Sequence, residues 1–222
     1  LFMKIYGFTL AEVLITLGII GIVASMTLPA LMSKYRANVT ITKLQKFNST
    51  MAQAQLRSIN DNGDVDCWDW VPADGESNNK ILLNWFNKYW TPYLNNIRII
   101  DRKIIKDNKL ADGGITFILG DGSVANMSGF SGGYIHVHYY PNYKTFIEEK
   151  TVEGVDDFIF GFNISNSKRF NTYGSQQKDE QELKFNSNYG CYTKNPVHAK
   201  AYCARLIQSN GWKLPQDYPY KF

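Results

Sequence analysis

The stretch that decides the fold is the hexapeptide G-F-T-L-A-E at residues 7–12, together with the apolar run that follows it to Met32. Between Phe8 and Met32 the only charged residue is Glu12. A helix of about 20 consecutive apolar residues crosses a bilayer, and a somewhat longer run can span it with a tilt. The sequence therefore predicts a membrane-spanning helix over residues 8–32.

Glu12 is unusual inside such a run. An acidic side chain costs about 2.5–3.5 kcal/mol at the centre of a membrane helix and less near its ends. Glu12 lies one turn from the start of the run, so its carboxylate either reaches the lipid head groups or has a cationic partner.

The hexapeptide and the sequence V-L-I-T-L-G-I-I-G-I-V-A at residues 13–24 together resemble the N-terminal signature of type IV prepilins and of the pseudopilins of type II secretion systems. The resemblance implies that a prepilin peptidase, which is also an N-methyltransferase, cleaves after Gly7 and methylates the new N-terminal Phe8. It also implies that Glu12 pairs with the Phe8 amine of a neighbouring subunit and so acts in assembly.

The first seven residues fit a prepilin leader. They carry Lys4 as their only charge and are too short for the apolar region of an ordinary secretory signal. Lys34 and Arg36 follow the apolar run, and counting these charges would place the C-terminal side in the cytoplasm. The resemblance implies the opposite, a single-pass protein of the bacterial inner membrane with its C-terminal domain outside the cytoplasm, and we follow it because charge bias is a tendency.

The helix is expected to continue beyond the membrane. Apolar residues recur at steps of three and four, at Leu44, Phe47, Met51 and Ala54. Pro29 is expected to kink the helix, and no further Pro or Gly occurs before Gly63. These features predict an amphipathic continuation over residues 33–60, whose apolar face packs against a sheet.

The sequence therefore divides into a leader at 1–7, a membrane and assembly helix at 8–32, its amphipathic continuation at 33–60, and an exported globular domain at 61–222. The predicted fold class is α+β: a pilin-like long helix packed on an antiparallel sheet. The globular domain is expected to contain helices at 79–90 and 203–207, a long exposed loop at 165–188, and strands at 97–100, 103–106, 115–119, 123–127, 134–140, 145–150 and 158–162.

The three cysteines, Cys67, Cys191 and Cys203, allow three single disulfides. Cys191 and Cys203 are close in sequence and flank a polar loop, so we favour that pair. Closing a loop of about 15 residues contributes roughly 3 kcal/mol. The C-terminal region also resembles the disulfide-closed end of major pilins.

Two groups of residues raise the question of a metal site. Asp61, Asp64, Asp66 and Asp69 lie close together, but their spacing does not match an EF-hand, and a solvated acidic loop is the preferred interpretation. His136 and His138 share one face of a strand, and such a pair can begin a zinc site.

The remaining histidine, His198, is distant in sequence, so we interpret the histidine pair as surface or packing residues. No metal site and no cofactor is expected.

The sequence G-V-D-D-F-I-F at residues 154–160 resembles a stretch found in many pilin-like proteins. The sequence D-x-N-G that often precedes this stretch in those proteins is missing here, so the calcium binding of some pseudopilins is not expected of this chain. Asp156 and Asp157 are interpreted as turn residues. No nucleophile elbow, phosphate-binding loop or dinucleotide fingerprint occurs. No catalytic residue is therefore predicted, and the protein is not expected to be an enzyme.

Two classes of function follow. The first is a structural subunit of a type IV pilus or type II secretion pseudopilus, whose partners are the peptidase, the inner membrane and other copies or related subunits. The second is a membrane-tethered binding module for a secreted substrate, carbohydrate or DNA. The formal net charge of +4 and the scattered Lys and Arg residues make a nucleic-acid partner the less favoured choice.

Overall fold

The computed structural model describes residues 7–69, 79–100, 114–130, 133–148, 150–164, 168–192 and 200–222. The chain forms two compact units, Leu1–Val39 with Phe222 and Thr40–Lys221. One helix, α1 (Leu10–Asn62), supplies most of the first unit and the N-terminal element of the second.

The part of α1 in the second unit is amphipathic, as the sequence predicts. Leu44, Met51 and Ala54 are fully buried, and Phe47 is nearly so. The helix ends at Asn62, two residues beyond the expected end. Gly63 follows with a φ of 81°, a conformation that glycine adopts without steric cost and that commonly ends helices.

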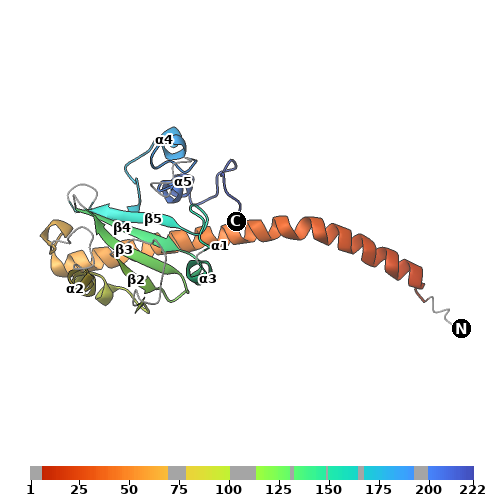
Figure 1. Cartoon of the computed structure of the whole chain (residues 1–222), viewed down its shortest axis with the longest axis horizontal. Helices are drawn as coiled ribbons and strands as arrows, with labels where there is room; N and C mark the ends of the chain where they lie inside the picture. The colour runs from red at the N-terminus through yellow and green to blue at the C-terminus, as the bar shows by residue number, and fades with distance from the viewer. Residues whose placement is uncertain are drawn as a thin grey trace, which may run out of the picture. The chain divides into compact units, whose positions relative to one another are not determined.

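Within the described residues, the sheet is an antiparallel meander of six strands in the order β1-β2-β3-β4-β5-β6 (Figure 1). The α+β, pilin-like fold class is thereby confirmed. Its strands are β1 (Arg98–Ile100), β2 (Ile115–Ile118), β3 (Val124–Phe130), β4 (Tyr134–Tyr140), β5 (Phe158–Asn163) and β6 (Asn171–Thr172). The strand expected at 103–106 lies outside the described residues.

Aromatic rings hold α1 to the sheet. The ring of Phe47 stacks on Tyr139 of β4 at a centroid distance of 4.1 Å and meets the ring of Phe160 of β5 edge-on at 5.1 Å. Such pairs contribute about 0.5–1.5 kcal/mol beyond the area that they bury. Because side chains alternate along a strand, His136 and His138 point to the opposite face of β4.

Every position of β5 is buried. Phe160 is covered by α1, and the helix α5 (Cys203–Ser209) packs against β5 and β6. Gln208 of α5 accepts a hydrogen bond from the Thr172 hydroxyl (2.7 Å) and donates one to the Asn171 side chain (2.7 Å). The C-terminal segment therefore closes the β5–β6 edge of the sheet.

The helix α2 (Asn79–Tyr89) lies where the sequence predicts a helix, at 79–90, and it carries a stripe of apolar, largely aromatic residues. Trp68, which follows the 3₁₀ turn Val65–Cys67, stacks on Tyr89 at 4.5 Å. Ile81 remains half exposed. The rest of the stripe is core: Leu82, Trp85, Phe86, Tyr89 and Trp90 are buried. A second 3₁₀ turn, Thr91–Tyr93, follows.

The strand expected at 145–150 is wrong, because that region contains the short helix α3 (Tyr143–Ile147). Asn142 starts this helix, since its side-chain oxygen accepts a hydrogen bond from the Lys144 backbone N–H at 2.9 Å. The single buried residue of α3, Phe146, is enough to dock one helical turn.

The long loop expected at 165–188 is also wrong in part, because it contains β6 and the helix α4 (Glu180–Phe185). Two apolar residues in this polar stretch, Phe170 and Leu183, are buried. Asp179 caps α4 by accepting a hydrogen bond from the Gln181 backbone N–H at 2.9 Å. Two apolar residues and one cap therefore organise a segment whose composition resembles that of a loop.

Candidate functional site

The candidate site is the start of α1, where the predicted cleavage position and the only acidic residue of the apolar run lie close together. Thr9 and Glu12 form a capping box. The backbone N–H of Glu12 donates to Thr9 Oγ1 (3.2 Å), and Glu12 Oε2 accepts from the Thr9 backbone N–H (2.8 Å) and hydroxyl (2.8 Å). The sequence pattern T-x-x-E contains this signal, but it was not among the features predicted above.

Residues Gly7, Phe8 and Thr9 precede the helix, so the peptide bond after Gly7 lies in non-helical backbone. Phe8 exposes 89% of its surface. Both donors to the Glu12 carboxylate are neutral, so they orient the group without removing its charge. The negative charge also lies at the positive end of the helix dipole.

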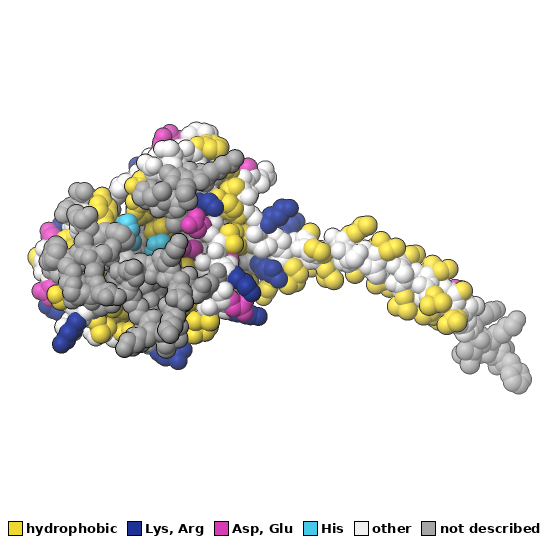
Figure 2. Space-filling model, viewed as in Figure 1, with side chains coloured by type: hydrophobic (Ala, Val, Ile, Leu, Met, Phe, Trp, Pro, Cys, Tyr) yellow, Lys and Arg dark blue, Asp and Glu magenta, His cyan; other side chains and the backbone are white. Residues whose placement is uncertain are grey.

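The following turns of α1 expose their apolar side chains. Figure 2 shows hydrophobic side chains along this part of the helix, and every Leu, Ile, Val, Met and Phe from Phe8 to Met32 keeps 42% or more of its surface exposed. By length and composition α1 is able to cross a membrane. Such a surface needs a covering of lipid or protein.

Pro29 lies inside α1. Proline has no N–H to donate to the carbonyl four residues earlier, which is that of Ser25. The kink expected at Pro29 stays a prediction.

Cys191 and Cys203 are joined by a disulfide in the C-terminal region, which is the pair favoured from the sequence. The Tyr220 hydroxyl donates to the Cys191 carbonyl at 2.7 Å, and the Tyr218 hydroxyl donates to the Gly154 carbonyl at 2.5 Å. The end of the chain is thus fastened to the disulfide and to the turn before β5. Cys67 is a free, exposed cysteine.

The two histidines of β4 have different surroundings. Burial, with a smaller contribution from the charge of His138, lowers the pKa of His136 to about 4, and its ring meets the Tyr173 ring edge-on at 5.0 Å. Burial alone would lower the pKa of His138, but the charge and hydrogen bond of Asp157 and the charge of Glu153 outweigh it, so the pKa is raised. Both histidines pack inside the domain, and His198 lies outside the described residues.

The acidic residues after α1 pair with lysines. Lys168 Nζ lies 2.7 Å from Asp66 Oδ2 and 3.5 Å from Asp64 Oδ2, and Lys88 Nζ lies 2.8 Å from Asp69 Oδ2. Hydrogen bonds from Lys168 and Lys88 lower the pKa values of Asp66 and Asp69, respectively. Within the described ranges, no group of three or more His, Cys, Asp or Glu side chains is placed to hold a metal ion.

The structure brings together residues that the sequence analysis treated separately. Asp157, interpreted as a turn residue, is buried and is the partner of His138. Gly7 and Phe8 immediately precede α1 and Glu12 lies in its first turn, whereas Pro29 and the disulfide belong to other regions.

Comparison with known proteins gives two matches. A model of the prokaryotic N-terminal methylation motif matches residues 2–28. A model described as a family of unknown function (DUF6613) matches residues 30–222. No curated protein and no solved structure matches the chain.

The matched region includes Gly7, Phe8 and Glu12, and from Leu10 onward it forms the start of the long helix α1. These two features together fit anchoring in the inner membrane and processing by a prepilin peptidase. The chain is therefore a type IV pilin-like prepilin that belongs to the family of unknown function DUF6613.

Proposed function

We propose that this protein is a structural subunit of a type IV pilus or of a type II secretion pseudopilus. The observation that carries the proposal is the contrast along α1. Apolar side chains from Phe8 to Met32 are exposed, whereas Leu44, Met51 and Ala54 of the same helix are fully buried. A lipid bilayer would cover the first set before assembly, and neighbouring subunit helices would cover it afterwards.

In this proposal prepilin peptidase cleaves after Gly7 and the new Phe8 amine is methylated. The protein is the substrate of this reaction and performs no chemistry itself. The carboxylate of Glu12 would then pair with the Phe8 amine of an adjacent subunit. Because few other polar groups lie in residues 8–32, this ion pair would fix the register of neighbouring helices, a role in which buried charges are best attested.

The direct test is mass spectrometry of the N-terminal peptide and of the intact protein from native membranes. We expect a chain that begins at Phe8 and carries one added methyl group. If the protein isolated from native membranes still has an N-terminal peptide that contains Lys4 and Gly7, the proposal is contradicted. The same protein expressed in a host that lacks prepilin peptidase serves as the uncleaved standard.

A further inference from the structure

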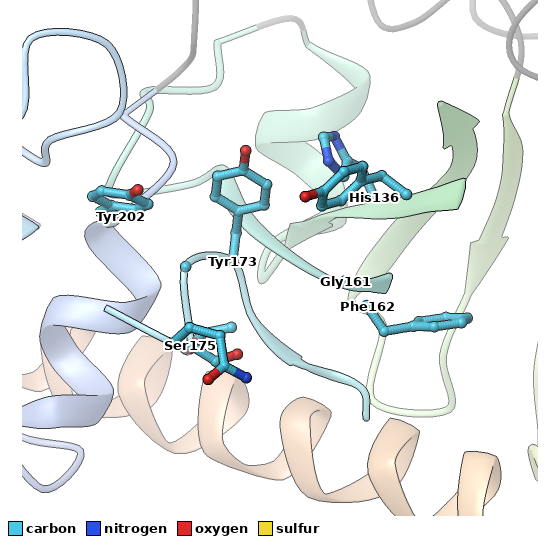
Figure 3. Close-up of a pocket in the computed structure, with 10 residues that line it drawn as sticks. His136, Gly161, Phe162, Tyr173, Ser175 and Tyr202 are labelled. Carbon is cyan, nitrogen blue, oxygen red and sulfur yellow. The ribbon is translucent and has the colours of Figure 1, made fainter. Parts of the chain in front are cut away.

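A pocket of about 200 Å³ lies in the second unit, where β4, β5 and the segment after β6 meet. Its lining residues come from segments that are distant in the sequence (Figure 3). They are Tyr134, His136, Gly161, Phe162, Thr172, Tyr173, Gly174, Ser175, Gln176 and Tyr202.

Aromatic rings form one side of this pocket. Figure 3 shows the rings of His136, Tyr173 and Tyr202 in a row along it. The centroids of Tyr173 and Tyr202 are 6.0 Å apart, with 31° between their planes. Tyr134, which also lines the pocket, keeps 42% of its surface exposed. The rings and phenol groups of three tyrosines therefore line this pocket.

A glycine allows the tyrosines to approach the backbone. Gly174 has a φ of 73°, and a Cβ atom there would lie 2.4 Å from the Tyr202 ring. Any larger residue would displace Tyr202. The backbone at Gly174 therefore determines where the Tyr202 ring can lie.

The polar groups of the pocket are neutral. Among the described residues that line it there is no Lys, Arg, Asp or Glu. Burial keeps His136 uncharged near neutral pH, with its pKa lowered to about 4, and burial raises the pKa values of Tyr173 and Tyr202. The phenols, the Ser175 hydroxyl and the Gln176 amide offer hydrogen-bond donors and acceptors without net charge.

We propose that this pocket binds one neutral pyranose ring of a carbohydrate. A sugar ring has an apolar C–H face, which packs against the negative face of an aromatic ring, and hydroxyl groups that both donate and accept hydrogen bonds. The pocket is smaller than the roughly 300–1,000 Å³ typical for drug-sized ligands, which suits a single ring. This binding activity goes beyond the structural role proposed above and does not depend on it.

A quaternary ammonium group is the main competitor, because cations also bind over aromatic faces. Its methyl groups cannot use the hydroxyl and amide groups that line this pocket. Those groups would lose water without gaining a partner, which is unfavourable. The neutral polar lining therefore favours the sugar.

The test uses the full-length chain in a polyoxyethylene detergent, which has neither a sugar nor a choline head group. An array of neutral oligosaccharides selects a ligand, and calorimetry then compares it with its terminal monosaccharide and with tetramethylammonium. Binding of the monosaccharide would assign the recognition to one ring. Binding of the oligosaccharide alone would place the recognised ring within a glycan chain.

Two variants locate the binding. Tyr134→Ala is expected to weaken it by about tenfold, the effect of losing one stacking ring, and Gln176→Ala, at an exposed position, is expected to weaken it as well. The matched control is Tyr143→Ala, because Tyr143 of α3 is 38% exposed and does not line the pocket. The proposal is overturned if no neutral sugar binds, if tetramethylammonium binds more tightly, or if both pocket variants bind like the wild type.

Discussion

The imidazole Nδ1 of His138 lies 3.0 Å from the Asp157 carboxylate Oδ1, and both residues are largely buried. Their contact joins β4 to the turn that precedes β5. The same turn is closed by the Gly154 backbone N–H, which donates to the Asp157 carbonyl at 3.0 Å. Asp157 therefore holds the turn through its backbone and β4 through its side chain.

This pair should make stability depend on pH. The pKa of His138 is raised in the folded chain. The pair's contribution to the free energy of unfolding is therefore fully present below the unfolded pKa of histidine, about 6.5. This contribution is lost as pH rises through the pKa of His138 in the folded chain. Asp157→Asn should therefore lower the free energy of unfolding by roughly 3 kcal/mol at pH 6. The loss at pH 9 should be smaller. Denaturant unfolding of the full-length protein at both pH values measures this difference.

The control for this prediction is a double-mutant cycle with His138→Gln. The coupling energy between the two positions should be about 1–3 kcal/mol at pH 6 and smaller at pH 9. Equal coupling at both pH values would show that the contact acts through packing and not through charge.

The fold was predictable where the pattern of nearby residues in the sequence determines which face of a helix or strand is buried. The period of the apolar residues places Phe47 on the buried face of α1, and alternation places Tyr139 on the buried face of β4. The contact of His138 with Asp157 was not predictable, because it joins residues 19 positions apart through a register that only the sheet defines. The site motif at residues 7–12 could be identified from the sequence because it is local.

The pocket tyrosines could not be found in this way. Tyr134 and Tyr202 come from β4 and from the residue before α5, and no sequence spacing relates them. The helix α3 was missed for a different reason, since five residues contain too little periodicity to separate a helix from a strand.

The second testable prediction concerns Gly154, which has a φ of 79° and lies next to Cys203 of the disulfide. A Cβ atom there would lie 2.9 Å from Cys203 Sγ and 2.9 Å from the Tyr220 ring. Gly154→Ala should lower the free energy of unfolding by about 3 kcal/mol, the sum of backbone strain and overpacking. Thermal and denaturant unfolding measure the loss.

Gly122 provides the matched control, because its φ is 76° and a Cβ atom there meets nothing within 4 Å. Gly122→Ala should therefore show only the backbone strain, about 1–2 kcal/mol. Equal losses for the two variants would mean that the contacts with Cys203 and Tyr220 contribute nothing.

The disulfide makes the third prediction. Replacing both Cys191 and Cys203 by serine should lower the free energy of unfolding by about 3 kcal/mol, because the bridge closes a short loop. Denaturant unfolding without reductant measures the loss. Cys67→Ser is the control, and it should leave stability within about 0.5 kcal/mol of the wild type, since Cys67 is exposed and free. A larger loss for Cys67→Ser than for the double variant would contradict this assignment.

The last prediction separates the two roles of Glu12, the helix cap seen in the structure and the assembly charge that we propose. Glu12→Gln keeps an oxygen that can accept from Thr9 but removes the charge, whereas Thr9→Ala keeps the charge and removes the hydroxyl of the capping box. If the charge pairs with a neighbouring Phe8 amine, Glu12→Gln should reduce the yield of sheared filaments at least tenfold, a change that needs only about 1.4 kcal/mol. Cleavage after Gly7 should be unchanged, as measured by mass spectrometry of the N-terminal peptide.

Thr9→Ala is the matched variant in this comparison. Losing an N-terminal cap costs a helix about 1 kcal/mol, and the long helix α1 can tolerate this loss at its first turn, so filaments should still form. Glu12→Ala, which removes both functions, should block assembly as Glu12→Gln does. Filament yields at the wild-type level in Glu12→Gln would assign Glu12 to capping alone and exclude it as the assembly charge.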